Sequence, residues 1–83
     1  MTKLFKNLTI QARLVLWLES KGYIQTDAKS SKYIALTKPG MGDARYFIGK
    51  AGAFRRGTSA TNSISTTPAP TFQTWCNEQE KPQ

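Results

Sequence analysis

Residues 33–57 read YIALTKPGMGDARYFIGKAGAFRRG, and this stretch decides the fold. It contains three short runs of apolar, aromatic and β-branched residues, and glycine and proline separate the runs. The pattern predicts strands at 32–38, 44–49 and 53–58. Consecutive strands joined by short turns pair antiparallel, so we expect a three-stranded antiparallel β-meander.

An amphipathic N-terminal helix is predicted to precede the meander, over residues 8–21. Its apolar residues are spaced to form one stripe along the helix, namely Ile10, Leu14, Trp17 and Leu18. Gly22 follows and supplies the residue type that commonly ends a helix. We expect this helix to cover one face of the sheet, and a short strand could follow it at 23–26.

The remainder of the chain is expected to add a connector and a second helix. Residues 58–71, TSATNSISTTPAPT, bury too little apolar surface to offset the entropy of ordering them, so they read as an extended connector. Residues 72–83 favour a short C-terminal helix ended by Pro82, followed by a tail. The predicted fold is therefore α+β, with its body at 1–57.

Charge is distributed unevenly along these 83 residues, whose formal net charge is +7. Residues 1–57 hold eleven Lys and Arg against three Asp and Glu, a net charge of +8, and residues 58–83 carry −1. A small basic body attracts polyanions, which makes nucleic acid or an acidic protein the expected partner. The longest apolar run, residues 14–18, is too short for a signal peptide or a membrane span, so we expect a cytoplasmic protein with no membrane partner.

Catalytic and metal chemistry find little support in the composition. Cys76 is the single cysteine and histidine is missing, which excludes the ordinary Cys/His zinc sites and leaves the thiol without an activating base. The acidic residues Glu19, Asp27 and Asp43 are too scattered to propose an acid/base pair. We therefore expect a binding protein, not an enzyme, with neither cofactor nor metal.

The candidate binding surface comes from basic side chains threaded through the meander. Neighbouring residues of a strand point to opposite faces, so only one of Arg55 and Arg56 can share a face with Arg45. That face would be open to solvent, with Tyr33 and Phe47 as possible stacking groups for bases. Phe47 could equally be an ordinary core residue. The candidate nucleic-acid or partner-binding residues are Arg45, Lys50, Arg55, Arg56, Lys32 and Phe47.

Two resemblances bear on function. The pattern KYIAL…ARYFIGKAGAFRRGTSATNS is similar to small uncharacterised accessory proteins of tailed bacteriophages, and it covers about residues 8–63. This resemblance implies a protein made in the cytoplasm of an infected bacterium, which binds DNA or inhibits a host enzyme or defence complex. The stretch ESKGYIQTDAKSSKYIALTKPG also resembles the end of a winged-helix domain, whose basic hairpin would fall on Lys29 and Lys32.

The leading hypothesis is therefore a small phage-encoded module that binds nucleic acid through a positively charged hairpin surface. The alternative is a phage-encoded inhibitor or adaptor that binds an acidic host protein, with Phe72 and Trp75 as interface anchors. A structural virion component is a third possibility. A homodimer is compatible with each of them, because an open sheet face and a free strand edge can pair.

Overall fold

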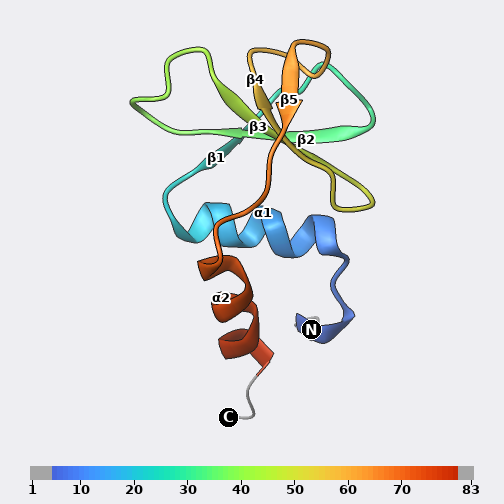
Figure 1. Ribbon diagram of the computed structural model, residues 1–83, viewed down its shortest axis with the longest axis vertical. Helices are drawn as coiled ribbons and strands as arrows, with labels where there is room; N and C mark the ends of the chain where they lie inside the picture. The colour runs from blue at the N-terminus through green and yellow to red at the C-terminus, as the bar shows by residue number, and fades with distance from the viewer. Residues whose placement is uncertain (1–4, 81–83) are drawn as a thin grey trace.

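The computed structural model describes residues 5–80 as an α+β fold with a five-stranded antiparallel sheet and two α-helices. The elements are η1 (Phe5–Asn7), α1 (Ile10–Ser20), β1 (Ile24–Thr26), β2 (Tyr33–Thr37), β3 (Arg45–Gly49), β4 (Phe54–Gly57), β5 (Ser63–Ser65) and α2 (Thr71–Glu80). The strands lie in the sheet in chain order, β1-β2-β3-β4-β5, so the whole sheet is a meander (Figure 1).

The α+β class is confirmed, whereas the predicted strand number is wrong. β2, β3 and β4 match the three predicted strands, and β1 lies where a short strand was thought possible. β5 falls inside residues 58–71, which we expected to form only a connector. Ile64 at its centre is 73% exposed, so this strand is held by pairing with β4 and not by burial of side chains.

α1 begins and ends close to the predicted bounds. The Thr9 hydroxyl accepts a hydrogen bond from the Ala12 amide at 3.1 Å and caps the helix. At the other end Gly22 adopts a φ of +98°, which only glycine tolerates readily, and turns the chain toward β1. Ile10, predicted to belong to the buried stripe, is instead 41% exposed, because it lies in the first turn of the helix.

The main core lies between α1 and one face of the sheet. Alternation along β2, β3 and β4 directs one set of side chains toward the helix. The buried residues of this core are Leu14, Val15, Trp17 and Leu18 from α1, and Leu36, Ile48 and Phe54 from the strands. The predicted packing of the helix on the meander is therefore confirmed.

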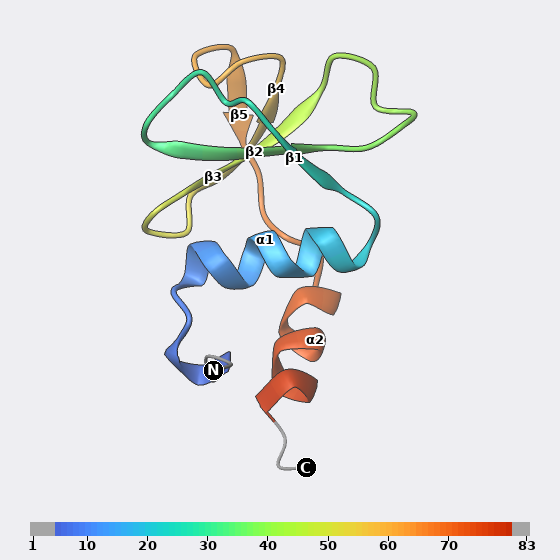
Figure 2. The ribbon, with the colours of Figure 1, turned by 180° about the vertical axis from the view of Figure 1, so that it is seen from behind.

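α2 lies on the other side of α1, so the layers run sheet, α1, α2 (Figure 2). The ring centroids of Trp17 and Phe72 are 5.2 Å apart, and those of Phe5 and Trp75 are 5.3 Å apart. This confirms a C-terminal helix, although its predicted end at Pro82 lies outside the described residues. No described helix is long and apolar enough to cross a membrane.

The second face of the sheet is covered, contrary to the expectation of an open surface. Ala35 and Phe47 point away from α1, yet both are fully buried. The β1–β2 and β4–β5 loops lie side by side in both views (Figures 1 and 2), and both lie next to Phe47. Two polar loops, and not a second layer of helices, therefore cover this face of the sheet.

Candidate nucleic-acid interface

The structure distributes the six candidate residues over the two faces of the sheet, the β3–β4 turn and the β1–β2 loop. Phe47 pairs with Arg55 in the β3–β4 register, and Tyr46 pairs with Arg56. Arg45, Phe47 and Arg55 therefore share the face away from α1, whereas Arg56 lies on the α1 side. The prediction that strand alternation separates Arg55 from Arg56 is confirmed.

Phe47 cannot serve as a stacking platform. Its side chain is 1% exposed, and its ring meets the Tyr33 ring edge-on with centroids 6.3 Å apart. A base could reach this ring only if the covering loops opened. Of the two interpretations of Phe47, the structure supports the core residue and contradicts the stacking group.

Arg55 is engaged within the fold. Its Nε donates to the Ser63 hydroxyl at 2.9 Å, and one terminal nitrogen donates to the Ser63 carbonyl oxygen at 2.6 Å. The other terminal nitrogen donates to the Ser65 hydroxyl at 3.1 Å. The guanidinium therefore stabilises β5, and its capacity to bind a phosphate is largely used.

Arg56 is exposed and belongs to a different surface. Its guanidinium carbon lies 5.7 Å from the centroid of the Tyr46 ring, within the range of a cation–π contact. Its cross-strand partner on β5 is the exposed Ile64. This row of Tyr46, Arg56 and Ile64 lies on the α1 side of the sheet, near the edge strand.

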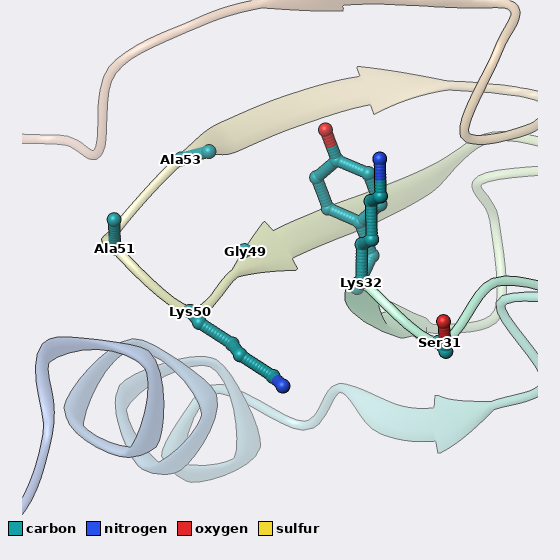
Figure 3. Close-up of a pocket in the computed structure, with 7 residues that line it drawn as sticks. Ser31, Lys32, Gly49, Lys50, Ala51 and Ala53 are labelled. Atoms are coloured by element: carbon teal, nitrogen blue, oxygen red, sulfur yellow. The ribbon is translucent and has the colours of Figure 1, made fainter.

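Lys32 and Lys50 line one hollow beside the β3–β4 turn, and their side chains leave it in different directions (Figure 3). This Lys32–Lys50 hollow has a volume of about 380 Å³ and is lined by Ser31, Lys32, Tyr33, Gly49, Lys50, Ala51 and Ala53. Figure 3 shows the Lys50 side chain leaving the β3–β4 turn, and the Lys32 side chain rising from the chain just before β2. Of the described residues that line the hollow, two are basic and none is acidic.

The geometry of the hollow depends on Gly49. Tyr33 lies opposite Gly49 in the β2–β3 register, and a Cβ at this glycine would lie 3.4 Å from Cε1 of the Tyr33 ring. The same Cβ would lie only 3.0 Å from the Cβ of Ala53. The missing side chain lets the tyrosine ring lie close over the strand, where it forms one wall of the hollow.

The β3–β4 turn places Lys50 at the rim. The Gly52 amide donates to the Gly49 carbonyl at 3.1 Å, and Gly52 adopts a φ of +92°. These two glycines therefore form an ordinary hairpin turn. Lys50, the residue after Gly49, is exposed at its tip.

The hollow combines groups suited to an anion that carries a flat ring. Two ammonium groups can neutralise phosphate oxygens, and the Ser31 hydroxyl can donate to another. The half-buried Tyr33 ring offers an apolar wall beside them. Lys32, Lys50 and Tyr33 were each predicted, but not that they line one hollow. Ser31 was missed, since no motif distinguishes it from the serines around it.

The predicted protein anchors pack against the core of the molecule. Phe72 and Trp75 are half-buried against the core, in contact with Trp17 and Phe5. Neither ring is therefore presented freely to a partner. Across residues 5–80, no three His, Cys, Asp or Glu side chains gather where they could hold a metal ion.

The surroundings of the hollow are strongly basic. Residues 23–66, which contain the sheet and its loops, hold seven Lys and Arg against two Asp, a net charge of +5. Residues 5–22 and 67–80, which contain the helices, hold three basic and three acidic residues and balance to zero. The positive field is thus concentrated on the sheet half of the molecule.

Comparison with known proteins adds no relative: no family model matches this chain, and neither the curated proteins nor the solved structures provide a match.

Proposed function

We propose that this chain is a small, phage-encoded, non-enzymatic module that binds nucleic acid through the Lys32–Lys50 hollow. The observation that carries the proposal is that two exposed lysines from different loops line one hollow with the Tyr33 ring, and that none of the described residues lining it is acidic. Lysines neutralise phosphates, and an aromatic ring supports the base or sugar next to them.

The charge distribution also favours binding of nucleic acid on the sheet half of the molecule. The net charge of +5 in residues 23–66 draws a polyanion to the sheet half, while the helices are neutral overall.

Following the phage resemblance, we place this binding in the cytoplasm of the bacterial host. A homodimer would use a free sheet edge, and the described strands offer two of them, the outer edges of β1 and β5.

The test is a salt series of fluorescence anisotropy with labelled single-stranded DNA, duplex DNA and RNA. The variant is Lys32→Gln/Lys50→Gln, and the matched control is Lys6→Gln/Lys21→Gln, which removes the same charge from exposed positions in η1 and after α1. Each lost phosphate contact lowers the slope of log K against log salt by about 0.7 for a single strand. The hollow variant should lose about 1.4 of slope, or about 25-fold in affinity at ~0.1 M salt.

The control should bind within about twofold of the parent, because a distant charge is screened at this salt. If both double variants weaken binding equally, the hollow is not the site. If the parent binds none of the three nucleic acids at low salt, the proposal fails.

A second candidate function rests on the row of Tyr46, Arg56 and Ile64. Tyr and Arg dominate the energetics of protein interfaces, and here they lie beside an apolar side chain that is exposed. An inhibitor or adaptor could use this row against an acidic host protein. An affinity pull-down from nuclease-treated bacterial lysate, with Arg56→Glu beside the parent, should then retain a stoichiometric protein on the parent alone.

A further inference from the structure

A second hollow lies beside the first. It has a volume of about 190 Å³ and is lined by Asp27, Ala28, Lys29, Arg45, Phe47, Thr58 and Ser59. The two hollows are neighbours, because Tyr33 of the first is in edge-on contact with Phe47 of the second. The β1–β2 loop lines both of them.

The second hollow has unused capacity to bind an anion. Lys29 and Arg45 contribute two positive charges, and Thr58 and Ser59 contribute hydroxyl groups. One terminal nitrogen of Arg45 donates to the Asp43 carbonyl oxygen at 3.0 Å. The Nε of Arg45 is buried and has no hydrogen-bond partner among residues 5–80. Because this Nε is almost inaccessible, an anion in the hollow would instead meet the Lys29 ammonium, the accessible part of the Arg45 guanidinium and the two hydroxyl groups.

Asp27 is the one lining residue that opposes an anion there. Its Oδ1 accepts a hydrogen bond from the Lys29 amide at 2.8 Å, and Lys29 adopts a φ of +52°, in the left-handed region. Asp27 therefore shapes the loop that carries Lys29. Its negative charge should nevertheless repel a phosphate in this hollow.

We infer that the ligand is a single strand whose backbone crosses the β1–β2 loop, with phosphates in both hollows. The inference rests on the proposed function and adds the class of nucleic acid and its path. Reading a duplex requires a helix or ribbon that enters a groove about 12 Å wide. Both helices lie on one side of the sheet, away from the β1–β2 and β4–β5 loops (Figure 1), so neither helix can enter a groove there. The hairpins that remain present small hollows between loops, which a flexible strand can follow.

Asp27→Asn tests this path, because asparagine keeps the Oδ1 acceptor for Lys29 and removes only the charge. Asp43→Asn is the matched control, since Asp43 is exposed on the β2–β3 loop and lines neither hollow. The probes are a labelled oligothymidylate of about 8 nucleotides and a duplex of equal length. Asp27→Asn should tighten single-strand binding about threefold to fivefold, and the control should change it less. Lys29→Gln should lower the salt slope by about 0.7.

The outcomes separate this inference from the proposed function. If Lys32→Gln/Lys50→Gln abolishes binding while Asp27→Asn and Lys29→Gln leave it unchanged, the path is wrong and the nucleic-acid function stands. Tighter binding of the duplex than of the single strand overturns the inference as well. Failure of the parent to bind any nucleic acid overturns both. Equal urea midpoints of parent and variants show that the substitutions leave the global stability of the fold unchanged.

Discussion

Arg55 holds Ser63 at two points: its guanidinium donates to the hydroxyl of this serine at 2.9 Å and to its carbonyl oxygen at 2.6 Å. A third hydrogen bond, at 3.1 Å, reaches the Ser65 hydroxyl. β5 comprises three residues that are all exposed or half-buried, so side-chain packing contributes little to its position. One arginine of the neighbouring strand therefore supplies much of what keeps this edge strand in the sheet.

Replacing Arg55 by alanine should release β5. Three hydrogen bonds from a half-buried charged group are lost, and we expect the free energy of unfolding to fall by about 1–2 kcal/mol. Urea denaturation measures the loss, and hydrogen exchange of the Ser63–Ser65 amides locates it. Arg56→Ala removes the same charge from the neighbouring position, whose side chain is exposed, and should cost at most about 0.5–1 kcal/mol, the range of an exposed cation–π contact. Equal costs for the two variants would contradict the conclusion that the Arg55 hydrogen bonds hold β5 in the sheet.

Replacing Phe47 by alanine should destabilise the fold strongly. A fully buried phenylalanine costs about 3–5 kcal/mol when it is truncated, a large part of the stability of a small domain. Phe47→Leu keeps most of the volume and should cost less than about 1.5 kcal/mol. Thermal unfolding followed by circular dichroism ranks the two variants. If Phe47→Leu instead weakened nucleic-acid binding with unchanged stability, the ring would be a contact residue after all.

The central strands could be predicted because their signals are local. Apolar alternation identifies β2, β3 and β4, and glycine turns mark their ends. β5 could not be predicted, because SIS contains a single apolar residue and its position depends on Arg55 and on main-chain pairing with β4. Strand alternation assigns Phe47 to a face, but it cannot show that two polar loops fold over that face. The Lys32–Lys50 hollow was missed for a related reason: it depends on the register that places Tyr33 opposite Gly49.

Replacing Gly57 by alanine should disrupt the β4–β5 turn. A Cβ at this position would overlap the Asn62 carbonyl oxygen and lie 2.5 Å from the Cα of Ser63. Both neighbours are backbone atoms, so only a shift of the turn can relieve the clash. We expect a loss of about 2–3 kcal/mol in the free energy of unfolding, measured by urea denaturation.

Gly42→Ala is the matched control for this glycine. A Cβ at Gly42 meets no atom within 4 Å, but its φ of +64° is unfavourable for alanine by about 1–2 kcal/mol. Gly57→Ala should therefore be the more destabilising of the two. The reverse order would show that the β4–β5 turn yields readily and that close packing does not require glycine there.

Cys76 should make stability depend on pH in the alkaline range. Burial raises the pKa of its thiol, which outweighs the lowering effect of the nearby Arg13 guanidinium. The folded chain therefore holds the thiol proton more tightly than the unfolded chain does. The stabilisation is complete below the ordinary thiol pKa of about 8.5, and it is lost as the pH rises through the raised pKa of the folded state.

Cys76→Ala isolates this contribution, because it removes the titrating group and leaves the Arg13–Glu80 ion pair in place. Free energies of unfolding measured between about pH 7 and about pH 10 should fall more steeply for the parent than for the variant. The folded thiol is 4% exposed, so iodoacetamide should modify it slowly in buffer and rapidly in urea. Parallel stability curves, together with rapid modification of the folded protein, would mean that α2 does not stay docked on α1 in solution.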